Sequence, residues 1–421
     1  MNHRLQCLCV EKESPDVGMA IDPSEVIQDE PCRIVGLVAH DAGPLSRAYG
    51  WIHRAARDDR KASSLVGVGR AVAAYAQAVS VDVGGGLAGR VDEVTMHSTV
   101  LEGNVLGDPA DRPLYVYLPP GYDDQPARRY PAIYVIQGYT GQVQGWFNRV
   151  PYRTPFLEAT DTLFATGTAP SCLIVLVDAF TRYGGSQFVD SPGTGRYHTY
   201  LCDEVVAYVD ARYRTLDDPA HRGIAGKSSG GFGAMITPML RPDLFGGLAS
   251  HAGDGLYEQN YLPAFGKAVR LLREYDADIH RWWDDFCSRP AFTKDGDEDL
   301  LMMLGLSACF SAEADGTPVL PFEPLTGVVR QDVWRRWLAW DPIRMVPTHA
   351  DALRGLRGIW LDAGTRDEFY LDLAAVAFRD ALRGIGVTDV AFELFDGGHF
   401  DIGYRYPAAV RYLAERLSPG S

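Results

Sequence analysis

The sequence has no uninterrupted apolar run long enough to cross a membrane, which takes about 20 residues. Basic residues are also in deficit, because 40 Lys and Arg stand against 55 Asp and Glu, a formal net charge of −15. Such an acidic balance repels the phosphates of nucleic acids and the anionic head groups of lipids. We therefore expect a protein that binds neither nucleic acid nor membrane. The sequence does not indicate its oligomeric state.

Cysteine is scarce and shows no pairing pattern. The seven residues are odd in number and scattered, and Cys7 and Cys9 have no further Cys or His pair nearby. This favours reduced thiols over a disulfide framework and indicates no metal site and no cofactor. The N-terminal residues also lack the long apolar segment and the small-residue cleavage site of a secretory signal. The expected location is the cytoplasm.

Residues 1–89 carry no motif. An alanine-rich stretch at 62–81 fits one helix, and the glycines at 84–86 fit a flexible joint. Two interpretations stay open for this N-terminal extension, a small appended unit or a partly disordered segment. The pattern of strands and helices described below begins at about residue 90 and runs to residue 421.

From Val91 onward, short strand-like runs alternate with helical candidates. Several of these runs are apolar on both faces, which is typical of central parallel strands covered by helices on each side. They lie at 132–136, 172–177, 247–250, 358–362 and 390–394, and the helical candidates include 200–213 and 407–417. This alternation predicts a mostly parallel, doubly wound α/β sheet.

One span, from about residue 257 to 350, has no strand signal. It holds five of the eight tryptophans, at positions 282, 283, 334, 337 and 340. We interpret it as a helical insertion that sits over the carboxyl edge of the sheet, near the site that the motifs below indicate.

The segment Gly226-Lys-Ser-Ser-Gly230 fits the pattern Gly-x-Ser-x-Gly of a nucleophile elbow. An apolar strand leads into it and a glycine-rich helix leads out, so Ser228 would stand on a sharp turn beside the positive end of a helix. Glycines on both sides allow the close approach of neighbouring backbone. An ordinary glycine-rich turn between strand and helix is the alternative.

A serine hydroxyl needs a base to take its proton and an acid to orient that base. The loop after the last strand carries His399, the one histidine in a suitable setting. The loop after the preceding strand offers Asp362, Asp367 and Glu368. We choose Asp367, which lies one loop further out, and keep Asp362 as the runner-up. Helix capping is the alternative role for the histidine and the acids.

The tetrahedral intermediate of acyl transfer also needs two backbone N–H donors, an oxyanion hole. Ser229, at the start of the helix after the nucleophile, would supply one. The loop Gln137-Gly-Tyr-Thr-Gly141 after the third strand would supply the other from Tyr139. The glycines of that loop could instead merely shape a turn.

From about residue 90 to its end, the chain resembles the putative-esterase family of α/β-hydrolases. This group includes esterase D (S-formylglutathione hydrolase), enterochelin-type siderophore esterases, feruloyl esterases and mycolyltransferases. The segments that carry the resemblance are VYLPPGY at 116–122, the loop at Gln137–Gly138, GKSSGG at 226–231, GTRDEF at 364–369 and GGHF at 397–400.

The resemblance implies an α/β-hydrolase fold with an eight-stranded, mostly parallel sheet and helices on both faces. It implies the nucleophile Ser228, the acid Asp367, the base His399 and the oxyanion donors Tyr139 and Ser229. Many relatives carry His-Gly where this chain has Gln137–Gly138, a difference that we expect to affect loop support more than chemistry. The long insertion also departs from the compact members of the family.

Aromatic residues give a further expectation about substrate binding. Trp334 and Trp337 fall on one helical face of the insertion, and Tyr183 follows the fourth strand. They could wall an apolar acyl pocket above Ser228, or the tryptophans could form the core of the insertion itself.

The function predicted from these residues is a metal-independent serine hydrolase, a serine esterase that cleaves a small-molecule carboxylic ester or thioester. Two alternatives remain open. An acyltransferase would use the same catalytic residues, and a non-catalytic binding protein could retain the same scaffold. The sequence does not identify the acyl or the alcohol group.

Overall fold

The structure is a computed structural model that describes residues 86–420 of the 421 residues. The first named element begins at Arg90. The predicted N-terminal extension, with its helix at 62–81, lies outside the described residues apart from its last four positions.

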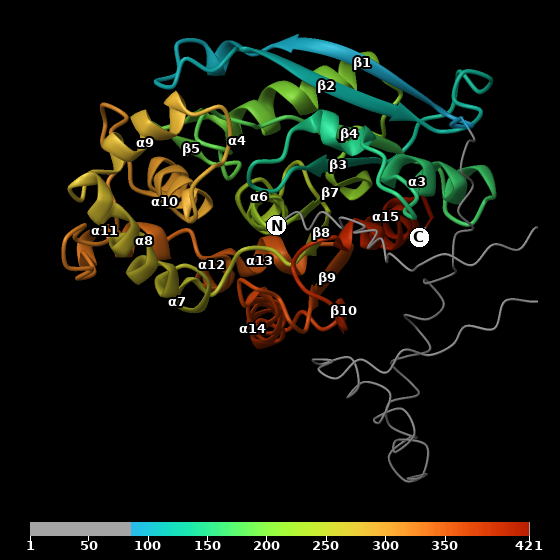
Figure 1. Ribbon diagram of the computed structural model, residues 1–421. Coiled ribbons are helices and arrows are strands. Elements are labelled where there is room, and N and C mark those ends of the chain that lie inside the picture. The colour runs from blue at the N-terminus through green and yellow to red at the C-terminus, as the bar shows by residue number, and fades with distance from the viewer. Residues whose placement is uncertain (1–85, 421) are drawn as a thin grey trace, which may run out of the picture. The chain divides into compact units, whose positions relative to one another are not determined.

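The fold is organised around one eight-stranded sheet with the strand order β1-β2-β4-β3-β7-β8-β9-β10 (Figure 1). Strand β2 pairs antiparallel with both β1 and β4, and the other neighbouring strands pair in parallel. The strands are β1 (Arg90–His97), β2 (Asp111–Leu118), β3 (Ala132–Ile136), β4 (Leu173–Val177), β7 (Arg222–Lys227), β8 (Gly247–His251), β9 (Gly358–Gly364) and β10 (Ala391–Phe395). The predicted mostly parallel sheet is confirmed.

The central strands are buried along their whole length. Every residue of β3, β4, β8 and β9 is buried, as their apolar sequences predict for strands covered on both faces. Helices α3 (Phe156–Ala165) and α15 (Tyr406–Leu417) pack on one face of the sheet. Helices α5 (Val206–Arg212), α6 (Ser229–Leu240) and α14 (Leu371–Gly384) pack on the other.

Helix α6 is central to the molecule because it packs on β3, β7 and β8 at once. Its residues from Ser229 to Met239 are all buried, so the helix has no polar face. A helix that is apolar all round belongs inside a protein. The insertion between β8 and β9 covers the side of α6 that the sheet leaves free.

Shorter elements connect these layers. Strands β5 (Asp190–Ser191) and β6 (Gly195–Arg196) form a small hairpin, and α4 (Tyr197–Thr199) continues through the π-helical turn η3 (Tyr200–Val205) into α5. Turns of 3₁₀-helix lie at η1 (Thr99–Leu101), η2 (Val143–Phe147), η4 (Pro219–His221), η5 (Leu262–Ala264), η6 (Arg273–Tyr275), η7 (Val346–His349) and η8 (Ile402–Arg405).

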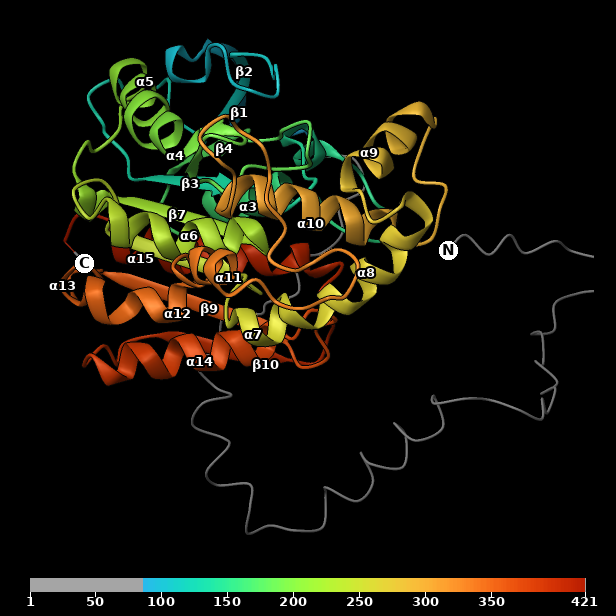
Figure 2. The same ribbon diagram turned by 90° about the vertical axis from the view of Figure 1, so that its left-hand side faces the viewer.

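Between β8 and β9 the described chain contains helices and no named strand. This insertion faces the viewer in Figure 2. Its helices are α7 (Tyr257–Asn260), α8 (Phe265–Leu272), α9 (Ile279–Ser288), α10 (Asp297–Phe310), α11 (Gln331–Leu338), α12 (Pro342–Met345) and α13 (Ala350–Arg354).

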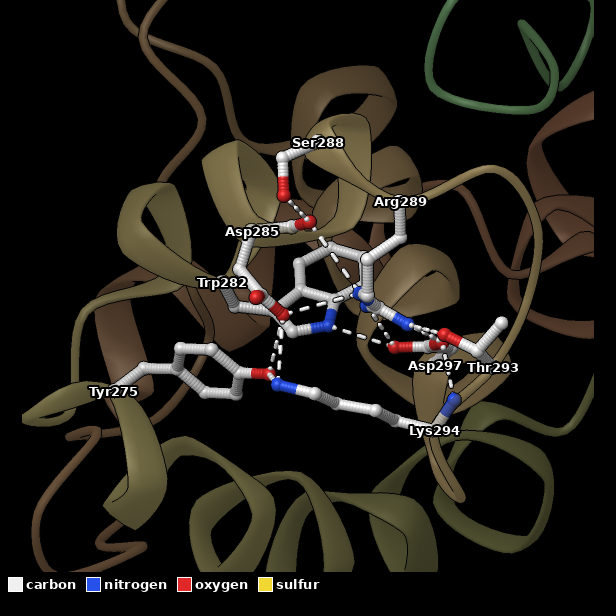
Figure 3. Close-up of polar contacts among 8 residues, drawn as sticks. All are labelled: Tyr275, Trp282, Asp285, Ser288, Arg289, Thr293, Lys294 and Asp297. Atoms are coloured by element: carbon white, nitrogen blue, oxygen red, sulfur yellow. Dashed lines mark hydrogen bonds and ion pairs between the residues drawn. The ribbon is translucent and has the colours of Figure 1, made fainter.

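A polar cluster closes the loop between α9 and α10 (Figure 3). The guanidinium of Arg289 donates two hydrogen bonds to the Asp297 carboxylate, over 2.6 and 2.7 Å. The same carboxylate accepts from the indole N–H of Trp282 at 3.2 Å and from the backbone N–H of Lys294 at 3.1 Å. Beside it, the Lys294 ammonium contacts Asp285 at 2.9 Å.

This cluster predicts an acid-sensitive contribution to stability. Burial alone would raise the pKa of Asp297, but Arg289, the Lys294 N–H and Trp282 together lower it to about 2, from 3.8. A lowered pKa in the folded state stabilises the fold above the unfolded pKa, here by about 2 kcal/mol. That contribution is lost as the pH falls from about 4 to about 2.

We therefore expect Asp297→Asn to lower the free energy of unfolding at neutral pH, and to do so less and less below about pH 4. Urea unfolding followed by circular dichroism over this pH range measures the difference. Asp284→Asn is the control, because Asp284 is exposed on α9 and should leave stability unchanged. The prediction would be contradicted if the free energy of unfolding fell by the same amount in wild type and in Asp297→Asn as the pH was lowered from neutral to about 2.

Candidate active site

Ser228 stands on a strained turn between β7 and α6. Its backbone has φ 58° and ψ −125°, a region that non-glycine residues rarely adopt. The glycines around it are crowded by backbone, since a Cβ on Gly226 would lie 2.3 Å from the carbonyl of Gly230. A Cβ on Gly230 would lie 2.5 Å from the carbonyl oxygen of Ile136. The segment therefore has the geometry of a nucleophile elbow.

Ser228, His399 and Asp367 form one continuous line of hydrogen bonds. The distance from Ser228 Oγ to His399 Nε2 is 3.1 Å, and that from His399 Nδ1 to Asp367 Oδ2 is 2.9 Å. Both His399 and Asp367 are buried. They follow β10 and β9, whereas Ser228 follows β7, so the carboxyl ends of three parallel strands bring the three residues together.

The loops that carry the acid and the histidine hold each other in place. The second oxygen of the Asp367 carboxylate accepts from the backbone N–H of Phe369 at 2.9 Å. Glu368 accepts from the backbone N–H of His399 at 2.6 Å. Asp367 thus contacts the imidazole, while Glu368 positions the backbone of the histidine loop.

Asp362, the runner-up acid, belongs to a different cluster. It accepts from His251 Nδ1 at 2.6 Å, from the Trp360 indole at 3.0 Å and from Arg405 Nε at 3.0 Å. Burial opposes ionisation of this carboxyl, but His251 and Arg405 more than offset it and lower its pKa. These partners give Asp362 a structural role, and among the described residues it makes no hydrogen bond or ion pair with His399.

The predicted oxyanion donors lie against the elbow. Ser229 is the first residue of α6, where backbone N–H groups have no acceptor within the helix. The loop after β3 approaches from the other side: a Cβ on Gly138 would lie 3.0 Å from the Lys227 carbonyl oxygen and 3.5 Å from the Ser228 Cβ. This close approach leaves little room for a Cβ and brings the loop of Tyr139 against the elbow.

The side chain of Tyr139 ties this loop to the insertion. Its hydroxyl lies 2.6 Å from the carbonyl oxygen of Tyr183 and 2.7 Å from that of Leu301 in α10. Gly184 and Gly305 pack closely around the ring and the hydroxyl. Burial raises the pKa of Tyr139, so the phenol stays a neutral donor. Gln137 supports the same loop by donating to the Gln142 carbonyl at 3.0 Å.

Asp254 is a residue of this site that the sequence analysis missed. It follows β8 and its carboxylate contacts Ser228 Oγ at 3.4 Å, Ser229 Oγ at 3.1 Å and the Tyr261 hydroxyl at 2.8 Å. Gln187 donates to Ser229 Oγ at 2.8 Å. The sequence signal that could have indicated it is its position shortly after β8, the strand that pairs with the nucleophile strand β7.

The three aromatic residues predicted to bind substrate all pack against other aromatic side chains. Trp334 and Trp337 are buried among Phe265, Tyr261 and Phe310. This placement is the core of the insertion, and it lends no support to an acyl pocket walled by these two rings. Tyr183 packs on Trp283 with ring centroids 5.0 Å apart and offers its backbone carbonyl to Tyr139.

Two other aromatic rings surround the histidine. The ring centroid of Phe369 lies 4.8 Å from that of His399, and the centroid of Phe400 lies 5.4 Å from it. Phe400 is 60% exposed, so one apolar ring stands at the surface next to the imidazole.

Over residues 86–420, no three His, Cys, Asp or Glu side chains are grouped so that they could hold a metal ion. Within the same range, every helix is too short or too polar to span a bilayer.

Comparison with known proteins identifies the family. The family model described as putative esterase matches residues 109–385. The chain belongs to this family. The sheet order and the elbow of this chain are those of the α/β-hydrolase fold.

Individual relatives are distant. An uncharacterised protein of Corynebacterium glutamicum is 25% identical over 142 residues, 34% of this chain and 32% of that protein. An endo-1,4-beta-xylanase/feruloyl esterase of Xylanibacter ruminicola is 26% identical over 134 residues, 31% of this chain and 18% of that protein. The matches thus span a third or less of these two curated relatives.

Among solved structures, a ferulic acid esterase superposes with a TM-score of 0.52 at 20% identity, covering 78% of this chain and 98% of that one. This likeness supports the α/β-hydrolase fold of the esterase domain.

The elbow geometry predicts a sharp difference between two glycine substitutions. Gly230→Ala would drive a Cβ to within 2.5 and 2.7 Å of two backbone carbonyl oxygens, so we expect a loss of roughly 2–4 kcal/mol in unfolding free energy. Gly266→Ala in α8 meets nothing within 4 Å and should be neutral or stabilising by up to about 1 kcal/mol.

Urea unfolding of the two variants measures this difference. Equal stability of Gly230→Ala and wild type would contradict the close approach of the β3 loop to the elbow.

Proposed function

We propose that this esterase-family protein cleaves a carboxylic ester or thioester through an acyl-enzyme intermediate, with Ser228 as nucleophile, His399 as base and Asp367 as orienting acid. The observation that carries the proposal is the hydrogen-bonded line from Ser228 Oγ through the imidazole to Asp367, with distances of 3.1 and 2.9 Å. No chemistry beyond proton transfer and acyl transfer is needed.

In the first half of the reaction, Ser228 Oγ attacks the substrate carbonyl carbon while His399 Nε2 takes the hydroxyl proton. The Asp367 carboxylate accepts from Nδ1–H and stabilises the imidazolium. Backbone N–H groups of Tyr139 and Ser229 receive the negative charge that develops on the carbonyl oxygen. His399 then gives its proton to the leaving alcohol or thiol, and the acyl group stays on Ser228.

In the second half, His399 takes a proton from water, which attacks the acyl carbon. Collapse of the second tetrahedral intermediate breaks the bond to Ser228 Oγ, and His399 returns the proton to the serine. The active site thus returns to its starting state with one ester and one water consumed.

The substrate panel for testing this proposal follows from the site and the relatives. It should contain p-nitrophenyl esters of increasing acyl length, a thioester and a feruloyl ester, because matched proteins are named feruloyl or ferulic acid esterases. The exposed Phe400 beside His399 supports binding of an apolar group at the mouth of the site.

Ser228→Ala should lower kcat by about four to six orders of magnitude on every substrate that the wild type cleaves. A fluorophosphonate probe should label the wild type and leave this variant unlabelled. The control is Ser288→Ala on the surface of α9, which should retain both activity and labelling (Figure 3). Retention of a tenth or more of the activity by Ser228→Ala would refute the proposal.

Tyr139→Phe tests the oxyanion loop without removing its backbone N–H. The single hydroxyl proton is shared between the carbonyl oxygens of Tyr183 and Leu301, and its loss leaves them without this donor, which costs about 1–3 kcal/mol. If part of that energy holds the donor in place, kcat should fall about tenfold with little change in KM. Steady-state kinetics on the best ester of the panel measures this.

Tyr117→Phe is the matched control, since its buried hydroxyl donates to Asp161 at 2.8 Å away from the site. It should lose stability but keep its kcat. Equal effects of the two substitutions on kcat would show that Tyr139 serves only stability.

A further inference from the structure

The mechanism above makes no use of Asp254, although this carboxyl touches the nucleophile. The residue is 5% exposed and follows β8 in the loop that passes beneath the elbow. Its side-chain partners are three hydroxyl groups, those of Ser228, Ser229 and Tyr261. Within residues 86–420, no Arg, Lys or His forms an ion pair with it.

An ionised carboxylate without a cation partner is costly to bury, and such a group commonly keeps its proton instead. Burial raises the pKa of Asp254, and the nearby Asp367 carboxylate acts in the same direction. Hydrogen bonds from Tyr261 and Ser229 and the charge of His399 oppose this. The other titratable groups that face it are Lys227 and Tyr257. The net effect is a raised pKa for Asp254.

The hydrogen bonds indicate where the proton of this acid lies. Gln187 donates to Ser229 Oγ at 2.8 Å, which leaves the Ser229 proton free to point to Asp254 Oδ2 at 3.1 Å. The Tyr261 hydroxyl donates to the same oxygen at 2.8 Å. Oδ2 therefore accepts twice, and the carboxyl proton belongs on Oδ1, whose neighbour is Ser228 Oγ at 3.4 Å.

We propose that Asp254 is a positioning residue that works as a neutral carboxylic acid, donating from Oδ1 to Ser228 Oγ and so directing the serine proton to His399. This inference rests on the proposed function. A serine hydroxyl has one proton to donate, and the productive acceptor is His399 Nε2 at 3.1 Å. When Asp254 donates a hydrogen bond to Ser228 Oγ, the proton of the serine hydroxyl remains available to the imidazole of His399.

The ionised form of Asp254 has the opposite effect. A carboxylate accepts and would compete with His399 for the serine proton. Its negative charge would also lie next to Ser229, whose N–H must stabilise the oxyanion. Activity should therefore fall as the pH rises through the pKa of Asp254.

The test compares the pH dependence of kcat/KM for wild type, Asp254→Asn and Tyr261→Phe. Asparagine mimics the neutral acid, because its amide N–H can donate to Ser228 while its oxygen accepts from Ser229 and Tyr261. Near neutral pH, kcat/KM of Asp254→Asn should stay within about threefold of the wild-type value. At alkaline pH, kcat/KM of the wild type should fall about tenfold per pH unit, and Asp254→Asn should lack this decline. Tyr261→Phe removes a hydrogen bond to the charged form and should move the decline to higher pH.

Asp341→Asn is the control, since Asp341 is a buried aspartate of the insertion that caps α12 and is bonded to backbone N–H groups. It should keep the wild-type alkaline decline. A wild type without such a decline, an unchanged decline in Asp254→Asn, or a loss of more than about a hundredfold for Asp254→Asn at neutral pH would each overturn the proposal.

A second measurement needs no catalysis. Infrared difference spectra between wild type and Asp254→Asn at neutral pH should contain the C=O stretch of a protonated carboxyl group, and its absence would also overturn the proposal. If the proposed function itself were wrong, Ser228→Ala would retain whatever activity the protein has, whereas the infrared band would be unaffected. The two failures are therefore distinguishable.

Discussion

The strained backbone at Ser228 is the constraint on which the rest of the site depends. A positive φ at a non-glycine residue persists only where the surroundings hold it in place. Here the β3 loop presses on one side through Gly138, and Gly230 presses α6 against the carbonyl of Ile136. The same contacts that enforce the turn bring the loop of Tyr139 and the first N–H of α6 to the hydroxyl. The same packing contacts therefore strain the backbone at Ser228 and align the N–H groups with its hydroxyl.

The insertion supports both sides of the proposed oxyanion hole. Tyr139 reaches the Leu301 carbonyl of α10, and Tyr261, which follows α7, donates to Asp254 beneath Ser229. The tryptophans that looked like candidates for a substrate wall instead make the rigid core that holds these two anchors, since Trp337 packs on Tyr261 with ring centroids 5.7 Å apart. The insertion therefore supports the loops around the elbow, and aromatic content alone does not distinguish that structural role from a lid.

Three aspartates lie near the carboxyl edge of the sheet, and each has a different set of partners. Asp367 meets an imidazole, and Asp362 meets His251 and Arg405, which lower its pKa. Asp254 meets only hydroxyl groups, and burial raises its pKa. The pKa shifts of Asp254 and Asp362 thus have opposite directions, because burial and local charge, and not the residue type, set the cost of ionisation.

Much of this arrangement was readable from the chain. The apolar runs predicted the parallel sheet, because strands buried on both faces need apolar residues throughout, and the glycines around Ser228 predicted the elbow, because only glycine tolerates such backbone contact. The spacing of Asp367 and His399 after successive strands predicted that they would face Ser228, since parallel strands end at one edge. The surroundings of Asp254, Trp334 and Trp337 were decided by the tertiary structure alone. A buried carboxyl or ring takes its function from neighbours that are distant in sequence, and no local pattern records which neighbours those will be.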